Sequence, residues 1–194
     1  IIWSVEDKPS IIRNRFELLI DEHLTIPESM ALIEIVQENA IQFAKIEHGI
    51  FKLNTDLLAA MVNKLCDKHA GLLVIDPMLS FYGGNENDNS QADIFMLGLS
   101  MLAQKLDISI LLIHHSKKDG SDVRGATAFH NKCRARYQIS IIKNGESVDK
   151  DAWDQGLRRI RIEKDSWGLR KYFFHQSEGE DWMNIQVVPV SRWT

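Results

Sequence analysis

Two apolar runs, each followed directly by acidic or imidazole side chains, dominate the polarity pattern of the chain. Residues 71–75 lead to Asp76, and residues 108–113 lead to His114 and His115. Neither run alternates strictly with polar residues, which predicts strands of a parallel sheet that are buried on both faces. Because ligands of open α/β sheets bind beyond the carboxyl ends of the strands, the pattern predicts a functional site at Asp76 and the two histidines.

The segment between these runs has the apolar spacing of a helix over residues 92–106. The residues expected on its inward face are Ile94, Leu97, Met101 and Leu102. A strand, a helix and a second strand in this length predict a right-handed crossover between parallel neighbours.

The rest of the pattern predicts an α/β core followed by a β-rich region. The earlier predicted elements are a strand over residues 1–5, a helix from Pro9, a short helix from near Pro27 to Val36, a short strand over residues 40–45, and a helix over residues 55–69 capped by Asn54 or Thr55. The later predicted strands cover residues 137–142, 159–163, 171–174 and 185–190. We therefore expect one domain with a parallel core over residues 1–116, a mobile basic loop region over residues 117–136, and an antiparallel extension over residues 137–194.

Composition places the chain among ordinary globular proteins. Of 194 residues, 44% are hydrophobic and 26% are charged, and the net charge of −4 excludes a globally basic nucleic-acid binder. Cys66 and Cys133 stand far apart without a CxxC pair, which argues against zinc and favours reduced thiols in a cytoplasmic protein. Because an apolar run opens at Ile1, we expect the chain to be a fragment of a longer protein.

One segment departs from the acidic average. Residues 116–137 contain six basic and two acidic side chains, a local charge of +4. The basic residues that fit contacts to a nucleic-acid backbone are Lys117, Lys118, Lys132, Arg134 and Arg136. A solvated basic face is an equally simple explanation of such a run.

The strand ends suit a Mg-nucleotide site, although each residue has a plainer explanation. Asp76 fits the acidic residue that holds Mg²⁺ in a P-loop nucleotidase, and a turn or cap aspartate fits it too. A polar residue where His114 and His115 stand can contact a γ-phosphate, and a capping or catalytic histidine remains an alternative. Adjacent strand residues point to opposite faces, so the two histidines are a poor metal-binding pair.

Three more residues are candidates for the same chemistry. Glu6 follows the first predicted strand and can polarise an attacking water, whereas a helix cap explains its neighbour Asp7 better. Arg124, in VRGATAF, can act as an arginine supplied across a subunit interface, and a solvated loop arginine fits it equally. Lys164, at the end of a later strand, is a second candidate for contact with the nucleotide. The phosphate-binding pattern GxxxxGK[ST] is absent from the sequence.

Taken in order, these motifs resemble the hexameric RecA-type ATPases of the plasmid replicative helicase RepA group, which belong to the AAA-family ATPases. The resemblance covers nearly the whole chain. The motifs that carry it are WSVEDKP, LLVIDP, GGNENDNS, ILLIHHSK, VRGATAF and EKDSWG. It implies an α/β RecA-like P-loop NTPase core, truncated at its N-terminus, that uses ATP and Mg²⁺.

The resemblance also implies roles for individual residues. Glu6 matches the carboxylate that activates water, Asp76 the Walker B aspartate near Mg²⁺, and His115 or His114 the γ-phosphate sensor. Arg124 matches the arginine finger that acts in trans, and residues 116–123 match a loop facing single-stranded DNA in the channel of a homo-oligomeric ring. The Walker A segment is missing, so the isolated fragment is expected to bind ATP poorly and to be inactive alone.

Other functions fit the same sequence. A RecA-like ATPase can serve recombination, phage defence or regulation without unwinding DNA. A RecA-like scaffold with a decayed site, or a DNA-binding domain, would be non-enzymatic, but the presence of Glu6, Asp76, His115 and Arg124 argues against decay. An unrelated α/β enzyme with His114 or His115 as its base has no partner nucleophile motif in the sequence.

Overall fold

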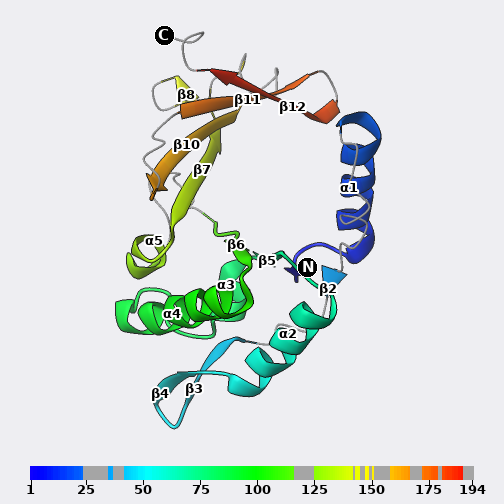
Figure 1. The fold of residues 1–194 in the computed structure, drawn as a ribbon. Coiled ribbons are helices and arrows are strands. Elements are labelled where there is room, and N and C mark those ends of the chain that lie inside the picture. Colours follow the sequence, from blue (N-terminus) through cyan, green and yellow to red (C-terminus); the bar gives the residue numbers. More distant parts are fainter. Residues whose placement is uncertain are drawn as a thin grey trace. The chain divides into compact units, whose positions relative to one another are not determined.

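The computed structural model describes residues 1–23, 35–36, 42–115, 125–141, 143–144, 147–148, 150, 158–166, 172–178 and 181–189. The chain divides into two compact units, Ile1–Lys132 and Cys133–Thr194 (Figure 1). Among the described residues, no helix is long and apolar enough to cross a membrane.

The first unit is built on a parallel sheet with the strand order β2-β1-β5-β6. The strands are β1 (Ile2–Ser4), β2 (Ile35–Val36), β5 (Leu72–Asp76) and β6 (Ser109–Leu112). In the register of β1 and β5, Ser4 lies opposite Asp76, and in that of β5 and β6, Ile75 lies opposite Leu112. The predicted parallel core is therefore confirmed, and its strands end at nearly the same level. Val36 belongs to β2, so the short helix predicted to reach it is wrong at that residue; most of that predicted segment lies outside the described residues.

Five helices are described in this unit: α1 (Pro9–His23), α2 (Thr55–Asp67), α3 (Met78–Tyr82), α4 (Asn89–Leu106) and α5 (Ala128–Asn131). The Asn54 side chain caps α2 by accepting a hydrogen bond from the Leu57 N–H at 3.2 Å. Asp88 caps α4 by accepting from the N–H groups of Ser90 and Gln91 at 2.9 and 3.1 Å. Because Asp88 supplies this cap, α4 begins three residues earlier than the apolar spacing predicts.

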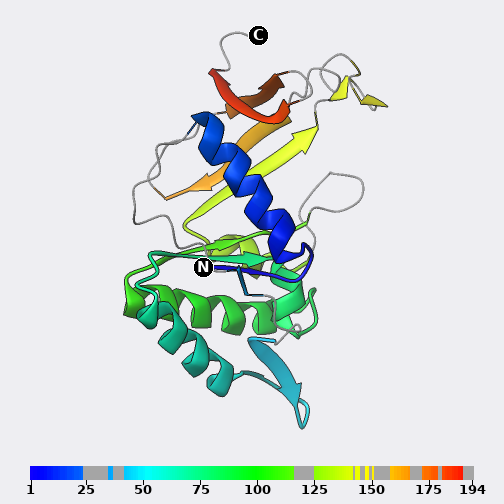
Figure 2. The same ribbon diagram turned by 90° about the vertical axis from the view of Figure 1, so that its right-hand side faces the viewer.

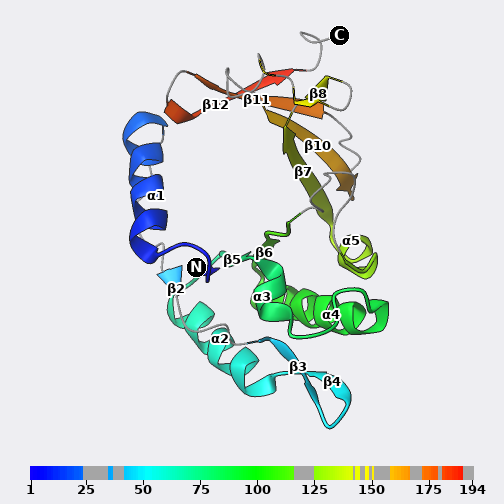
Figure 3. The ribbon, with the colours of Figure 1, turned by 180° about the vertical axis from the view of Figure 1, so that it is seen from behind.

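The predicted strand over residues 40–45 is part of a hairpin, β3 (Ala44–Glu47) and β4 (Ile50–Leu53). His48 and Gly49 form its turn with φ values of +51° and +78°, the left-handed conformation that two-residue hairpin turns favour. Figure 3 shows this hairpin beside α2 and away from β5 and β6.

The buried face of α4 differs from the predicted one. Ile94, Leu97 and Met101 are 40%, 54% and 61% exposed, and of the predicted set only Leu102 is buried. The residues that α4 buries are Ala92, Phe95, Met96, Leu99 and Leu102. Apolar residues occupy two neighbouring stripes of this helix, so helical spacing alone selected the wrong one.

The prediction that the central strands are buried on both faces is also wrong. Leu73 and Ile75 of β5 are fully buried, whereas Leu72 is 45% exposed and Leu111 of β6 is 49% exposed. Figure 2 shows α2 and α4 on one face of the sheet. In this chain those helices cover the face that carries Leu73 and Ile75, while the alternate strand residues remain accessible.

Aromatic rings fill the centre of the first unit. Trp3, Phe43 and Phe81 form one cluster with ring centroids 5.4 to 5.9 Å apart. Tyr82 joins a second cluster, with its ring 5.2 Å from that of Phe95 and 5.1 Å from that of Phe129. The second cluster therefore ties α3 and α4 to α5.

The second unit is an antiparallel sheet with the strand order β12-β11-β10-β7. Its strands are β7 (Ala135–Ile141), β10 (Arg158–Asp165), β11 (Tyr172–Glu178) and β12 (Asp181–Pro189), and a separate pair consists of β8 (Lys143–Asn144) and β9 (Ser147–Val148). The predicted antiparallel extension is confirmed. The predicted loop region over residues 117–136 contains, in its described part, α5 and the first residues of β7.

Tyr82 provides a test of the aromatic core. Burial raises the pKa of Tyr82 to about 12, and its hydroxyl donates to the Asn85 carbonyl at 3.2 Å. Tyr82→Phe should lower the free energy of unfolding by about 0.5–1.5 kcal/mol, the usual worth of one hydrogen bond. Tyr82→Ala should cost about 3–5 kcal/mol because it leaves a cavity among the rings. Urea unfolding measures both, and equal losses would show that the ring contacts are not stabilising.

Candidate functional site

Three predicted site residues lie together beyond the carboxyl ends of β1, β5 and β6. Glu6 follows β1, Asp76 ends β5, and His115 follows β6. The Nε2–H of His115 donates to Oε1 of Glu6 at 2.9 Å, although 109 residues separate them in the sequence. The side chains of His115 and Glu6 remain about half exposed, at 61% and 48%, so the pair faces solvent at the edge of the sheet.

Asp76 is the half-buried member of this group. Burial raises the pKa of its carboxyl above the ordinary value of 3.8, the Glu6 carboxylate raises it further, and His115 opposes the shift. The Val5 N–H donates to the Asp76 carbonyl at 3.1 Å, which extends the pairing of β1 and β5 beyond the strands. The parallel sheet therefore holds two carboxylates near each other with an imidazole beside them.

The donor set at this edge fits Mg²⁺ that accompanies a phosphate ligand. Within the described part of the chain, no group of three or more histidine, cysteine, aspartate or glutamate side chains forms a dedicated metal cage. Mg²⁺ commonly uses one or two protein carboxylates and completes its octahedron with phosphate oxygens and water. Asp76 supplies one accessible carboxylate of this kind.

The two adjacent histidines have different surroundings. His115 reaches Glu6, whereas the Nδ1–H of His114 donates to the His115 carbonyl at 2.8 Å. The His114 ring lies 5.9 Å from the Phe129 ring, between centroids. Sequence reasoning left both histidines open as the group at the nucleotide, and the geometry brings His115 to the other candidate residues.

Asp7, next to Glu6, has a separate partner. Its Oδ2 forms an ion pair at 2.5 Å with Nη1 of Arg15, two turns along α1. Of the two neighbouring carboxylates, Glu6 is therefore the one directed to His115.

The basic candidate residues do not gather at this edge within the described chain. Lys132 forms a long ion pair with Asp93, with 3.7 Å between Nζ and Oδ1. The Arg134 carbonyl accepts hydrogen bonds from the backbone and hydroxyl of Ser166 in the second unit. Lys164 lies opposite Arg136 in the pairing of β10 with β7. Lys117, Lys118 and Arg124 lie outside the described residues.

Arg136, another candidate for nucleic-acid contacts, is engaged within the second sheet. Its Nη2 donates to Oε2 of Glu163 at 2.9 Å, and both side chains are largely buried. A register shift between Ile162 and Lys164 accompanies this pair. We infer that Arg136 stabilises the sheet and contributes little to a basic surface.

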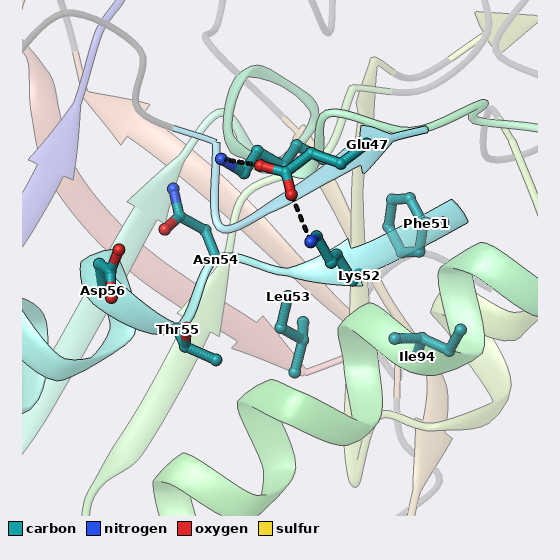
Figure 4. Close-up of a pocket in the computed structure, with 9 residues that line it drawn as sticks. Glu47, Phe51, Lys52, Leu53, Asn54, Thr55, Asp56 and Ile94 are labelled. Carbon is teal, nitrogen blue, oxygen red and sulfur yellow. Dashed lines mark ion pairs between the residues drawn. The ribbon is translucent and has the colours of Figure 1, made fainter. Parts of the chain in front are cut away.

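A groove of about 510 Å³ lies elsewhere, between the β3–β4 hairpin and α4 (Figure 4). Its lining residues are Lys45, Glu47, Phe51, Lys52, Leu53, Asn54, Thr55, Asp56 and Ile94. Hydrogen bonds from Lys45 and Lys52 lower the pKa of Glu47 to about 2. Because this carboxylate is already paired with two ammonium groups, the groove offers less to a Mg-nucleotide than the sheet edge.

Asn89 is a residue that the sequence analysis did not select. Its Oδ1 accepts hydrogen bonds at 3.1 Å from both the Thr127 hydroxyl and the Ala128 N–H. These donors belong to the RGATAF motif, and Asn89 belongs to the motif GGNENDNS. The presence of an Asn-rich loop directly before a helix was the available signal, but sequence alone does not reveal which motif it contacts.

Asp76→Asn tests the electrostatic strain at the edge. The variant removes the repulsion with Glu6 and keeps the shape of the side chain. At neutral pH we expect the free energy of unfolding to rise by at most about 1 kcal/mol, because solvent screens half-exposed charges. An acid with a raised folded-state pKa destabilises the fold above that pKa, so the gain should vanish below the ordinary value of 3.8. Urea unfolding at both pH values measures this gain.

Asp56→Asn is the matched control. Asp56 lies in the first turn of α2, where a negative charge is favourable, so its removal should cost about 0.3–1 kcal/mol at neutral pH. If the Asp76 variant loses stability in the same way, the repulsion between Asp76 and Glu6 is not a significant term.

Comparison with known proteins agrees with this architecture. The structure is similar to the ATPase domain of a solved protein, with a TM-score of 0.65 and 13% identity over 96% of this chain and 73% of that chain. It is similar to a DnaB-like replicative helicase, with a TM-score of 0.63 and 12% identity over 95% of this chain and 50% of that chain. A KaiC-like protein from Pyrococcus horikoshii gives a TM-score of 0.60 and 15% identity over 97% of this chain and 75% of that chain. No curated protein matches the chain in sequence.

At these identities the structural likenesses show the fold, which is that of RecA-like ATPase domains: a parallel sheet flanked by helices, with antiparallel strands toward the C-terminal end. The family follows from the sequence, because residues 1–121, more than half of the chain, match the sequence model described as AAA domain. The chain therefore belongs to the AAA domain family.

Proposed function

We propose that the chain forms the hydrolytic part of a RecA-like ATPase whose complete protein is a replicative DNA helicase of the plasmid RepA type. The observation that carries the proposal is the hydrogen bond between His115 and Glu6 beside Asp76 at the carboxyl edge of the sheet. A carboxylate positioned by an imidazole, next to a second carboxylate that suits Mg²⁺, is an arrangement that can hydrolyse a nucleotide triphosphate.

In the proposed mechanism Glu6 orients a water molecule and accepts its proton. The water oxygen attacks the γ-phosphorus, the bond from that phosphorus to the bridging oxygen breaks, and ADP and phosphate leave. The His115 N–H that donates to Glu6 keeps the carboxylate in place and can also donate to a γ-phosphate oxygen, which gives it the role of the phosphate sensor. Mg²⁺, held by Asp76, would neutralise the charge on the phosphate oxygens.

The remaining roles belong to the proposed ring of identical subunits. Arg124 is assigned to the nucleotide of the neighbouring subunit, with Lys164 as a second candidate for contact there. Lys117, Lys118, Lys132 and Arg134 are assigned to single-stranded DNA, where sequence-independent contacts to phosphates are sufficient. Support for the helicase comes from the fold shared with a DnaB-like replicative helicase, of which the chain spans half the length.

An ATPase that does not separate strands is the second candidate. A KaiC-like protein has nearly the same structural similarity to the chain as the DnaB-like helicase, with TM-scores of 0.60 and 0.63. The fold therefore does not separate the two functions.

The ATPase assignment is tested in the complete natural protein. We expect Glu6→Gln and Asp76→Ala each to lower kcat for ATP hydrolysis by about 10²–10⁴-fold, the usual contribution of a positioned general base or charge-stabilising group. Asp7→Asn is the matched control, because it removes the neighbouring carboxylate, which is paired with Arg15, and should leave kcat close to that of the wild type. Unchanged turnover in both site variants would refute the assignment.

The helicase assignment has its own test. The complete protein should displace a labelled strand from a forked DNA duplex in the presence of ATP, and Glu6→Gln should abolish displacement while DNA binding remains. Robust ATP hydrolysis without strand displacement or movement on single-stranded DNA would favour the second candidate.

A further inference from the structure

One carboxamide fastens the chain that follows Arg124 to the start of α4. Oδ1 of Asn89 accepts two hydrogen bonds, from the Thr127 hydroxyl and from the Ala128 N–H, each at 3.1 Å. The two donor residues are 38 and 39 positions from Asn89, so this contact joins two motifs that are distant in the sequence. A single oxygen thus satisfies the first donors of α5.

The helix cap of α4 does not need Asn89. Asp88 already accepts from the N–H groups of Ser90 and Gln91, so it supplies the cap by itself. The Asn89 side chain is therefore used for the contact with residues 127–128 rather than for its own helix.

The backbone on both sides of this contact is fixed as well. The Ala126 N–H donates to the Glu86 carbonyl at 2.6 Å. Gly125 has a φ of +94°, and a Cβ at this position would lie 2.8 Å from the same Glu86 oxygen. Only glycine fits so close an approach in this conformation. The loop between α3 and α4 therefore holds the chain from its first described residue after Arg124.

Phe129 connects the same segment to the strand tip of the site. Its ring lies 5.1 Å from that of Tyr82 and 5.9 Å from that of His114, which directly precedes His115. Residues 125–129 are thus held by polar contacts at one end and by ring packing at the other.

We propose that Asn89 is a positioning residue for ATP hydrolysis, which fixes residues 125–128 so that Arg124, directly before them in the sequence, is presented to the nucleotide of the neighbouring subunit. The inference rests on the proposed function, because Arg124 has that role only there. The Asn89 oxygen acts on the backbone and hydroxyl of its own chain, and the effect on the rate arises in the adjacent site.

The first test uses three variants of the complete protein. Asn89→Ala removes the acceptor and should lower kcat for ATP by about 10- to 100-fold with little change in KM, as expected for a misplaced catalytic group. Asn89→Asp keeps an oxygen acceptor and should restore most of the rate. Asn87→Ala is the matched control, because Asn87 is an exposed residue of the same loop whose side chain makes no hydrogen bond within the described chain. An unchanged kcat in Asn89→Ala, or an equal loss in all three variants, would overturn the proposal.

The second test asks in which subunit Asn89 acts. Rings are assembled from a mixture of Asn89→Ala and Glu6→Gln subunits, each nearly inactive alone. Where a Glu6→Gln subunit presents Arg124 to an Asn89→Ala subunit, both the base and the arginine of that site are intact. We expect the mixture to regain activity. Absence of recovery would show that Asn89 supports only its own subunit's site, which contradicts the proposal.

A parallel mixture of Arg124→Ala and Glu6→Gln subunits separates the two levels of the argument. Recovery in this mixture together with none in the Asn89 mixture overturns the role of Asn89 alone. Failure of recovery in both, in a protein whose wild type hydrolyses ATP, overturns the trans arginine and the inference with it.

Discussion

The parallel register of β1, β5 and β6 determines where the chemical groups of the site lie. Parallel strands end at a common edge, and the pairings of Ser4 with Asp76 and of Ile75 with Leu112 bring three chain segments to that edge at one level. A shift of one residue in either pairing would turn Glu6 or His115 to the other face of the sheet. The 2.9 Å hydrogen bond between these two residues is therefore a consequence of the strand register.

The site is held together against its own electrostatics. Burial and the Glu6 carboxylate both raise the pKa of Asp76, so the two acids are unfavourable neighbours in the absence of a cation. His115 relieves part of this repulsion, and the packed face of the sheet, with Leu73 and Ile75 fully buried, supplies the stability that tolerates the remainder. Such opposition between stability and charge is typical of sites that bind metal-nucleotide ligands.

The sequence predicted the strands and the edge residues well because both depend on local signals. Uninterrupted apolar runs with polar ends locate β5 and β6, and Asp76 and His115 follow from them directly. Two kinds of information were missing. Helical spacing did not distinguish the stripe through Phe95 and Leu99 from the exposed stripe through Leu97, because both are apolar. The sequence also did not indicate that Asn89 contacts residues near Thr127, since that pairing depends on how α3, α4 and α5 pack.

Metal-directed cleavage tests most directly whether the nucleotide's metal binds at this edge. Fe²⁺ replaces Mg²⁺ with ATP in the complete protein, and peroxide then generates hydroxyl radicals that cut the backbone close to the metal. The account predicts ATP-dependent cuts near Glu6 and Asp76, which Asp76→Ala abolishes. Cuts near Glu47 and Asp56 in the groove beside the β3–β4 hairpin, with none near Asp76, would contradict it.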